Sequence, residues 1–336
     1  MCIQFNGLNM KYKSLIGVLV FAIFATDVAM AQFGVDAVRR NTRDRAIEGS
    51  SNEQAAEIQE AVADEALVPE QVLNSEPARV LATKDIAYGR HERQALDIYL
   101  PEDTAGTQAN LPVVIFFHGG GYIAGDKSTG EAFNRFLAAE DVIGISAGYR
   151  LAPESTWPSG AEDVAGVIQW VQRNIEDYGG NAERIFLLGY SAGAEHVANY
   201  VFTEEYQVFE DGVVGSMLVA GATYDLSLGL NASGTALDSE GQAAYFGGDI
   251  ESFAEMSSIH ELEGRKIPLL IAYAQNDFEI VQLQTSALIN ALYERDNALP
   301  SIIQGIGYDH FSLLRHVVAG EPSVVGQQVL SFIQAH

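Results

Sequence analysis

The sequence predicts an α/β fold in which helices cover both faces of a mostly parallel sheet. Residues 112–117 (Pro-Val-Val-Ile-Phe-Phe) form an unbroken apolar run, which is typical of a strand buried on both faces. A second apolar run at 185–188 leads into the turn Gly189-Tyr-Ser-Ala-Gly193, and helix-compatible residues follow at 194–201. Strands alternate with helices in this way along the chain, which is the order expected of a parallel sheet.

The other elements continue this alternation. Apolar residues at 164, 167, 168, 171 and 175 recur with the spacing of an amphipathic helix, which Gly179-Gly180 is expected to end. Helices are also predicted over 288–293 and 311–318. The remaining predicted strands occupy residues 80–88, 94–100, 142–146, 216–220, 267–273 and 301–306.

The composition restricts the classes of partner. A chain of 336 residues allows one large domain or two small ones. The formal net charge of −26 argues against nucleic acid or an anionic membrane surface, because both require clustered lysine and arginine. Cys2 is the one cysteine, so no disulfide or cysteine-based site is expected. His91 and His260 are isolated from other ligand residues, and neither a metal nor an organic cofactor is predicted.

The N-terminus has the pattern of a signal peptide. A short basic region precedes the apolar run 15–25, and Ala29-Met-Ala31 has the small residues of a signal-peptidase site. We therefore predict that residues 1–31 are removed and that the mature protein is periplasmic or secreted. The apolar run is short for a membrane span, so no stable membrane association is expected after cleavage. The sequence leaves open whether translation starts at Met1 or Met10.

Two further segments are distinguished by composition. Residues 32–78 are polar, acidic and rich in alanine, which predicts a helical or partly disordered leader. The main domain is predicted to cover 79–336. Within it, residues 225–262 carry many glycine, serine and alanine residues without strand alternation. This segment is interpreted either as a small cap insertion or as a long surface connection.

Two motifs suggest chemistry. In Gly189-Tyr-Ser-Ala-Gly193, Ser191 would stand on a strained bend between strand and helix, with glycines leaving room for both to pack. His118 and the glycines 119–121 directly follow the clearest strand. Backbone N–H groups in such a loop can form an oxyanion hole, whereas the phosphate-binding glycine patterns are not matched. His118 itself is interpreted as a structural residue that holds the loop.

Together these motifs resemble the α/β-hydrolase superfamily. The chain is similar to carboxylesterases of the hormone-sensitive-lipase type and to feruloyl-esterase-like and kynurenine-formamidase-like enzymes, and the segment 149–154 (Tyr-Arg-Leu-Ala-Pro-Glu) resembles the same group. The resemblance extends from about residue 81 to the C-terminus. It implies an α/β-hydrolase fold and a serine carboxylic ester hydrolase. Tyr190 and Ala194 depart from the lipase-like pattern, which leaves the subfamily open.

The superfamily order of serine, acid and histidine is matched by Ser191, Asp277 and His310. Each lies just beyond the carboxyl end of a predicted strand, where parallel sheets place their ligand crevice. His310 would accept the serine proton and Asp277 would orient the imidazole. The N–H groups of Gly119, Gly120 and Ala192 are the predicted oxyanion donors.

Each member of this triad has rivals nearby in the sequence. His316 and His196 compete with His310 for the role of base, but both fall within predicted helices. Glu279 and Asp309 compete with Asp277 for the role of acid. Asp277 is the preferred acid, since Glu279 falls in the first turn of a helix and Asp309 adjoins the histidine.

The substrate is less sharply defined. We expect Tyr122, Tyr190, Phe278 and Phe311 to line a substrate pocket, because they adjoin the motif residues. The predicted substrate is a small to medium soluble ester, cleaved through an acyl-enzyme. An arylformamidase-type amide hydrolase and a non-catalytic binding protein of the same fold remain alternatives. The natural substrate and the oligomeric state are left open.

Overall fold

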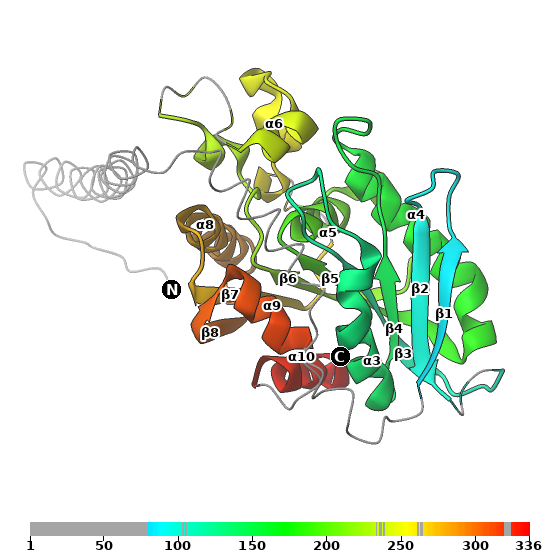
Figure 1. Ribbon diagram of the computed structural model, residues 1–336. Helices are drawn as coiled ribbons and strands as arrows, with labels where there is room; N and C mark the ends of the chain where they lie inside the picture. The colour runs from blue at the N-terminus through cyan, green and yellow to red at the C-terminus, as the bar shows by residue number, and fades with distance from the viewer. Residues whose placement is uncertain are drawn as a thin grey trace, which may run out of the picture. The chain divides into compact units, whose positions relative to one another are not determined.

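The computed structural model describes residues 80–102, 104, 106–232, 234, 237, 239–260, 262, 265–318 and 324–336. The predicted signal peptide and leader lie outside these residues. Eight strands of the described part form one sheet in the order β1-β2-β4-β3-β5-β6-β7-β8 (Figure 1). The strands are β1 (Val80–Ala87), β2 (Ala95–Pro101), β3 (Leu111–Phe117), β4 (Ile143–Ala147), β5 (Gly180–Tyr190), β6 (Val213–Val219), β7 (Leu269–Asn276) and β8 (Ser301–Asp309).

The sheet is mostly parallel, as predicted. β1 pairs with β2 and β2 pairs with β4 in antiparallel orientation. Every later pair, from β4 with β3 to β7 with β8, is parallel. The carboxyl ends of β3, β5, β6, β7 and β8 therefore meet at one edge of the sheet, where loops from distant parts of the chain come together.

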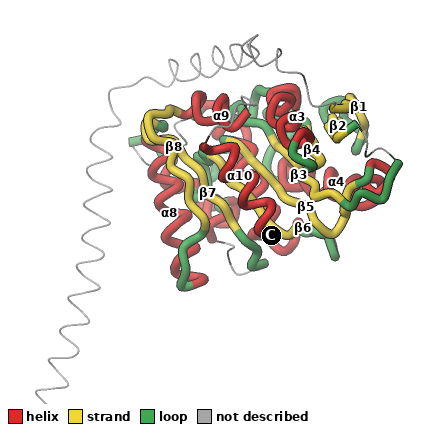
Figure 2. Tube along the Cα trace, turned by 90° about the horizontal axis from the view of Figure 1, so that it is seen from below, coloured by secondary structure: helices red, strands yellow, loops and turns green. Residues whose placement is uncertain are grey.

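Helices cover both faces of the sheet (Figure 2). One face packs against α4 (Ser159–Asn174), α5 (Ala192–Phe202) and α8 (Glu279–Asp296). The other packs against α3 (Glu131–Ala139), α9 (His310–Val318) and α10 (Val324–Ala335). Helices α3 and α10 are not among the predicted elements. Their apolar residues do lie at helical spacing, but each segment is short.

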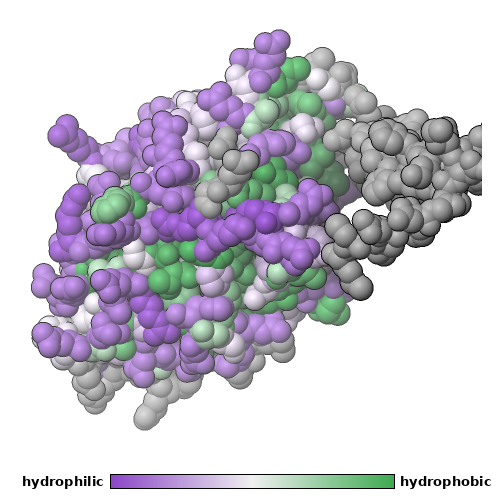
Figure 3. Space-filling model, turned by 180° about the vertical axis from the view of Figure 1, so that it is seen from behind, coloured by the Kyte–Doolittle hydropathy of each residue, from purple (hydrophilic) through white to green (hydrophobic). Residues whose placement is uncertain are grey.

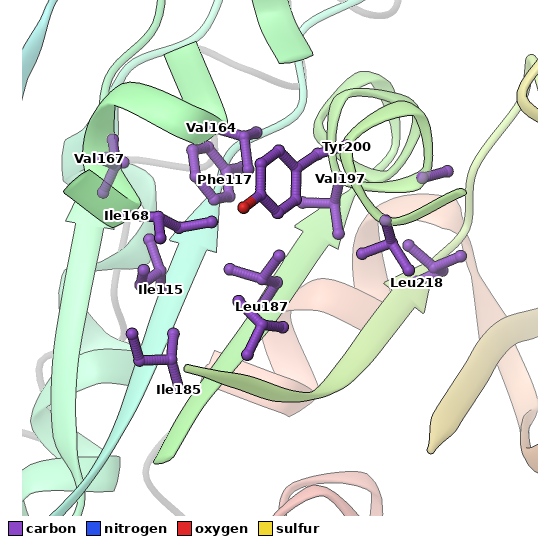
Figure 4. Close-up of a cluster of buried hydrophobic side chains, with 14 of the residues drawn as sticks. Ile115, Phe117, Val164, Val167, Ile168, Ile185, Leu187, Val197, Tyr200 and Leu218 are labelled. Carbon is purple, nitrogen blue, oxygen red and sulfur yellow. The ribbon is translucent and has the colours of Figure 1, made fainter. Parts of the chain in front are cut away.

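The core follows the alternation of side chains along each strand. In β3, Val113, Ile115 and Phe117 belong to the cluster under α4 and α5, whereas Val114 and Phe116 belong to the opposite cluster. All five are buried, which explains the unbroken apolar run in the sequence. Figure 4 shows the first cluster, with residues from β3, β5, β6, α4 and α5, including Ile115, Phe117, Val164, Ile168, Leu187, Val197 and Leu218.

The described residues of the segment 225–262 form short helical pieces beside the strand ends (Figure 1). They are the 3-10 helices Leu226–Gly229, Ile250–Ser252 and Ser258–His260, with α6 (Glu240–Phe246) and α7 (Phe253–Met256) between them. A third hydrophobic cluster joins Tyr245, Phe246 and Phe253 of this segment to Tyr122 and Ala192. The segment is therefore packed onto the loops that follow β3 and β5.

The face in Figure 3 is mostly hydrophilic, with smaller hydrophobic areas. Exposed large hydrophobic side chains of the described residues include Phe209, Leu299 and Ile306. No helix in the described ranges combines the length and the apolarity that crossing a bilayer requires.

Candidate active site

Ser191 occupies a strained bend between β5 and α5. Its φ of 51° and ψ of −117° lie outside the regions that a non-glycine residue prefers, at a cost of about 1–3 kcal/mol. Its N–H donates to the carbonyl oxygen of Val219 (2.8 Å) and helps to hold the bend. A Cβ at Gly193 would overlap the carbonyl oxygens of Phe117 and His118, so a larger residue there would push α5 away from β3.

The structure brings Ser191, Asp277 and His310 together. His310 Nε2 lies 3.1 Å from Ser191 Oγ, and His310 Nδ1 lies 2.8 Å from Asp277 Oδ1. Both distances are within the range of a working proton relay. The Asp277 carboxylate also accepts hydrogen bonds from the N–H groups of Ala274 (3.2 Å) and Phe278 (3.0 Å). Its side chain is fully buried and that of His310 is 7% exposed, so the pair is shielded from water.

The rival acids are used elsewhere. Glu279 is exposed in the first turn of α8. Asp309 is exposed just before α9, where its Oδ1 accepts from the N–H of Ser312 (2.7 Å), as a helix-capping residue does. Asp277 is the candidate that hydrogen-bonds to the His310 ring.

The rival base His196 lies in an aromatic environment on α5. Its ring packs edge-on against Tyr149 at 4.6 Å and Tyr245 at 5.2 Å between centroids. Burial lowers the pKa of His196 to about 3, so the ring is neutral near pH 7. The side chain of His316 lies outside the described part of the structure.

The glycine loop after β3 has the backbone that its sequence suggests. Gly120 and Gly121 have φ values of 125° and 58°, which favour glycine. Gly119, Gly120, Ser191 and Ala192 all line one cavity. Among the described residues, none accepts a hydrogen bond from the N–H groups of Gly119, Gly120 or Ala192. These groups remain available to a ligand, as an oxyanion hole requires.

His118 holds this loop from behind. Its Nδ1 lies 2.6 Å from the carbonyl oxygen of Gly119, and its Nε2 lies 3.5 Å from a guanidinium nitrogen of Arg93. These partners assign the proton to Nδ1. The Tyr149 hydroxyl donates to the His118 carbonyl oxygen (2.7 Å), and the two rings stack at 4.2 Å. Burial lowers the pKa of His118 to about 4, so the ring is neutral near pH 7.

Every predicted substrate residue lines the cavity, and so do several residues that the sequence did not single out. The cavity is open to solvent, and Tyr122, Tyr190, Phe278 and Phe311 all line it. The rings of Phe278 and Phe311 lie 5.0 and 5.3 Å from that of His310. The lining residues that the sequence did not single out are Ala222, Ser239, Gln242, Ile280 and Val281.

Ser239 and Gln242 did leave a local signal in the sequence. The pattern Ser-x-x-Gln predicts a helix start, and the Ser239 hydroxyl indeed accepts from the N–H of Gln242 (3.4 Å). The pattern predicts the helix but not its place beside Ser191. In the described residues, no three histidine, aspartate or glutamate side chains are grouped as metal ligands would be.

Comparison with known protein families identifies the family of this chain. The BD-FAE family model matches residues 96–292, more than half of the chain, including Ser191 and Asp277. The chain belongs to the BD-FAE family. His310 lies beyond the matched residues.

Curated relatives of this BD-FAE chain match it only in part. The probable isoprenylcysteine alpha-carbonyl methylesterase ICMEL2 of Arabidopsis thaliana is 38% identical over 122 residues, which are 36% of this chain and 28% of that protein. Esterase LipI of Mycobacterium tuberculosis is 41% identical over 97 residues, 29% of this chain and 30% of that protein. The chain therefore spans less than a third of the length of either relative.

One solved structure resembles this chain over most of its length. Esterase B from Lactobacillus Rhamnosis has a TM-score of 0.64 with 19% identity, over 85% of this chain and 94% of that one. This similarity confirms the α/β-hydrolase fold predicted from the two motifs.

Proposed function

We propose that this BD-FAE chain is a serine esterase that hydrolyses small to medium soluble carboxylic esters through an acyl-enzyme. The observation that carries the proposal is the hydrogen-bonded relay from Ser191 through His310 to Asp277, which opens into a cavity lined by the glycine loop. The names of the two curated relatives, both esterases, support an ester as the substrate.

In the acylation step, Ser191 Oγ attacks the ester carbonyl carbon while His310 Nε2 takes the hydroxyl proton. Asp277 keeps the Nδ1–H of His310 oriented and stabilises the imidazolium without accepting the proton. The carbonyl electrons move to oxygen, where the N–H groups of Gly119, Gly120 and Ala192 stabilise the negative charge. The bond to the alcohol oxygen then breaks, and His310 returns its proton to the departing alkoxide.

The deacylation step repeats the chemistry with water. His310 Nε2 takes a proton from water, whose oxygen attacks the acyl carbon. The second tetrahedral intermediate collapses, the bond to Ser191 Oγ breaks, and the serine regains its proton from His310. The acid product leaves, and the free relay is restored.

The cavity favours a neutral substrate with an apolar part. Aromatic and aliphatic side chains form most of its lining, and Gln242 supplies an amide for a polar substituent. The net charge of −26 disfavours anionic substrates. A short-chain acyl ester, or an acetyl or hydroxycinnamoyl ester of a saccharide, meets these conditions. Export through cleavage of residues 1–31, to the periplasm or the medium, is part of the proposal.

The test is a series of initial rates for the mature chain on p-nitrophenyl esters of increasing acyl length, with methyl ferulate alongside. We expect turnover that falls as the acyl chain grows and that disappears in Ser191→Ala. Folded protein without turnover on any ester would contradict the proposal. An N-formyl arylamine is the additional substrate that would then identify an amide hydrolase.

A further inference from the structure

The helix α6 touches the glycine loop directly. Gly241, in the first turn of α6, lies so close to Gly121 that a Cβ at position 241 would overlap the Gly121 carbonyl oxygen. The two residues belong to different parts of the chain, since Gly121 follows β3 and Gly241 lies within 225–262. In Figure 1, α6 stands beyond the strand ends. The loop therefore has a neighbour that constrains its position from outside the sheet.

Helix α6 also packs against Tyr122, the residue that follows the glycines of this loop. The Tyr245 ring stacks on the Tyr122 ring with 4.8 Å between centroids and 10° between planes. Phe246 meets the Tyr122 ring edge-on at 5.2 Å, and the Tyr122 hydroxyl is hydrogen-bonded to the Thr223 hydroxyl. Aromatic pairs of this kind are directional, so they fix the ring of Tyr122 rather than merely burying it.

Tyr122 needs such support because its backbone is strained. Its φ of 72° is uncommon for a bulky side chain, and a residue of this kind keeps such a conformation only when its surroundings enforce it. The Tyr122 carbonyl oxygen accepts from the N–H of Ala152 (3.0 Å). That hydrogen bond fixes the backbone on one side, and the stack with Tyr245 fixes the side chain on the other.

Tyr245 is itself firmly anchored. Its hydroxyl accepts from the N–H of Gly160 (2.9 Å), and its carbonyl oxygen accepts from the N–H of Trp157 (3.0 Å). Gly160 lies in the first turn of α4 and Trp157 lies just before it, so the anchor belongs to the main sheet-and-helix body. Tyr245 is 2% exposed and is not among the residues that line the cavity. Tyr245 can therefore influence the reaction only indirectly, and the stack on Tyr122 is its contact with the glycine loop.

We propose that Tyr245 is a positioning residue for the oxyanion loop, acting through Tyr122, and that the Gly241–Gly121 contact is the second point at which α6 fixes this loop. The inference rests on the proposed function, because a loop is positioned for catalysis only if its N–H groups stabilise an oxyanion. Donors must be fixed where charge develops, so a small displacement weakens the transition state more than the bound substrate.

The test uses four variants of the full mature chain. Tyr245→Leu removes the stack, and Tyr245→Phe keeps the ring and removes the hydroxyl. Gly241→Ala inserts a methyl group against Gly121, and Gly248→Ala is its matched control, because a Cβ there meets nothing within 4 Å. The measurements are kcat and KM on a p-nitrophenyl ester, affinity for a trifluoromethyl ketone, and amide hydrogen exchange of residues 118–125.

We expect kcat to fall about 10- to 100-fold in Tyr245→Leu and Gly241→Ala while KM changes by less than about 3-fold. Affinity for the trifluoromethyl ketone should fall in parallel with kcat/KM, because its hemiketal oxyanion uses the same donors. Hydrogen exchange of 118–125 should become faster in these two variants. Gly248→Ala should resemble the wild type in all three measurements, whereas Tyr245→Phe, which keeps the stack on Tyr122 but loses the hydrogen bond from Gly160, should lie between the wild type and Tyr245→Leu.

Two results would overturn the inference. One is a change in KM alone, which would make Tyr245 a contributor to substrate binding. The other is unchanged exchange of 118–125 in folded Tyr245→Leu and Gly241→Ala. If the wild type had no ester turnover, the proposed function would fail, yet the exchange experiment would still decide whether α6 positions the loop.

Discussion

The two sides of the cavity are built in different ways. Ser191, Asp277 and His310 follow β5, β7 and β8, whose hydrogen bonds and two buried clusters fix the strand ends. The facing wall with Ser239 and Gln242 comes from short helices within 225–262, which are held by a smaller third cluster. The sheet thus holds the three residues of the proposed relay, whereas 225–262 contributes Ser239 and Gln242 to the cavity and contacts the glycine loop through α6.

The largest expected loss of activity comes from substitutions on the side of the cavity that is built on the sheet. Ser191→Ala and His310→Ala should each lower kcat/KM about 10⁴- to 10⁶-fold, since each removes a member of one relay. The double variant should lose no more than either single variant, because the relay acts as a unit. Initial rates on one p-nitrophenyl ester measure this. Additive losses would show that the two residues do not work together.

The next largest loss of activity distinguishes Asp277 from the rival acid Asp309. Asp277→Asn should lower kcat about 10³- to 10⁴-fold, because the imidazole loses the partner that sets its tautomer. Asp309→Ala removes a helix cap and should cost about 1 kcal/mol of stability while retaining activity within about 3-fold. Kinetics and thermal unfolding of both variants, with Glu279→Ala alongside, measure this. Equal kinetic losses at positions 277 and 309 would refute the assignment of the acid.

A smaller effect is expected on the side formed by 225–262. Gln242→Ala should change the ratio of kcat/KM between two esters that differ in a hydroxyl substituent, by about 1–3 kcal/mol. The rate on the simplest acetyl ester should stay within about 3-fold. Gln328→Ala, an exposed glutamine on α10, is the control. Uniform loss on all esters would place Gln242 in the chemistry and remove the contrast between the two sides.

The smallest effect on activity concerns the junction between the two regions. Glu195 of α5 is buried and accepts from Asn199 (2.9 Å) and from Ser258 (3.3 Å) of the 225–262 segment. Burial raises the pKa of Glu195 well above its usual range, although hydrogen bonds from Ser258 and Asn199 oppose the shift. Above about pH 4.5 the unfolded chain ionises this group while the folded chain keeps its proton, so Glu195 lowers stability as pH rises.

Glu195→Gln should therefore raise the free energy of unfolding at pH 7 by about 1 kcal/mol or more, since one unit of pKa is worth about 1.4 kcal/mol. The gain should vanish near pH 4, and kcat should stay within about 2-fold. Denaturant unfolding between pH 4 and 8 measures it, with exposed Glu205→Gln as the control. A gain independent of pH would show that the pKa of Glu195 does not differ between the folded and unfolded protein.

The sequence alone predicts the strand and turn that carry Ser191 and the strand ends near Asp277 and His310. An apolar run before Gly189-Tyr-Ser-Ala-Gly193 is a local pattern, because strand burial and the close approach of α5 both depend on adjacent residues. The resemblance to the superfamily supplied the order Ser191, Asp277 and His310, and the predicted strand ends placed these residues at one edge of the sheet. The strands β7 and β8 run three residues further than predicted, to Asn276 and Asp309, so Asp277 and His310 follow them directly.

The sequence alone does not predict which residues of 225–262 line the cavity. Gln242 reaches the cavity, and Tyr245 reaches Tyr122, only because 225–262 packs on loops that are distant in the chain. No local pattern encodes that packing, since the described part of the segment forms short helices without a regular apolar repeat. Whether 225–262 acts as a cap remains a prediction.

The central claim is that Ser191 is the nucleophile that carries the acyl group. The most direct measurement is the intact mass of the mature chain after reaction with a p-nitrophenyl phosphonate, followed by mapping of the modified peptide. We predict one phosphonyl group per chain, located on Ser191, with release of one equivalent of p-nitrophenol and no modification of Ser191→Ala. Modification of another residue, or equal labelling of Ser191→Ala, would contradict the account.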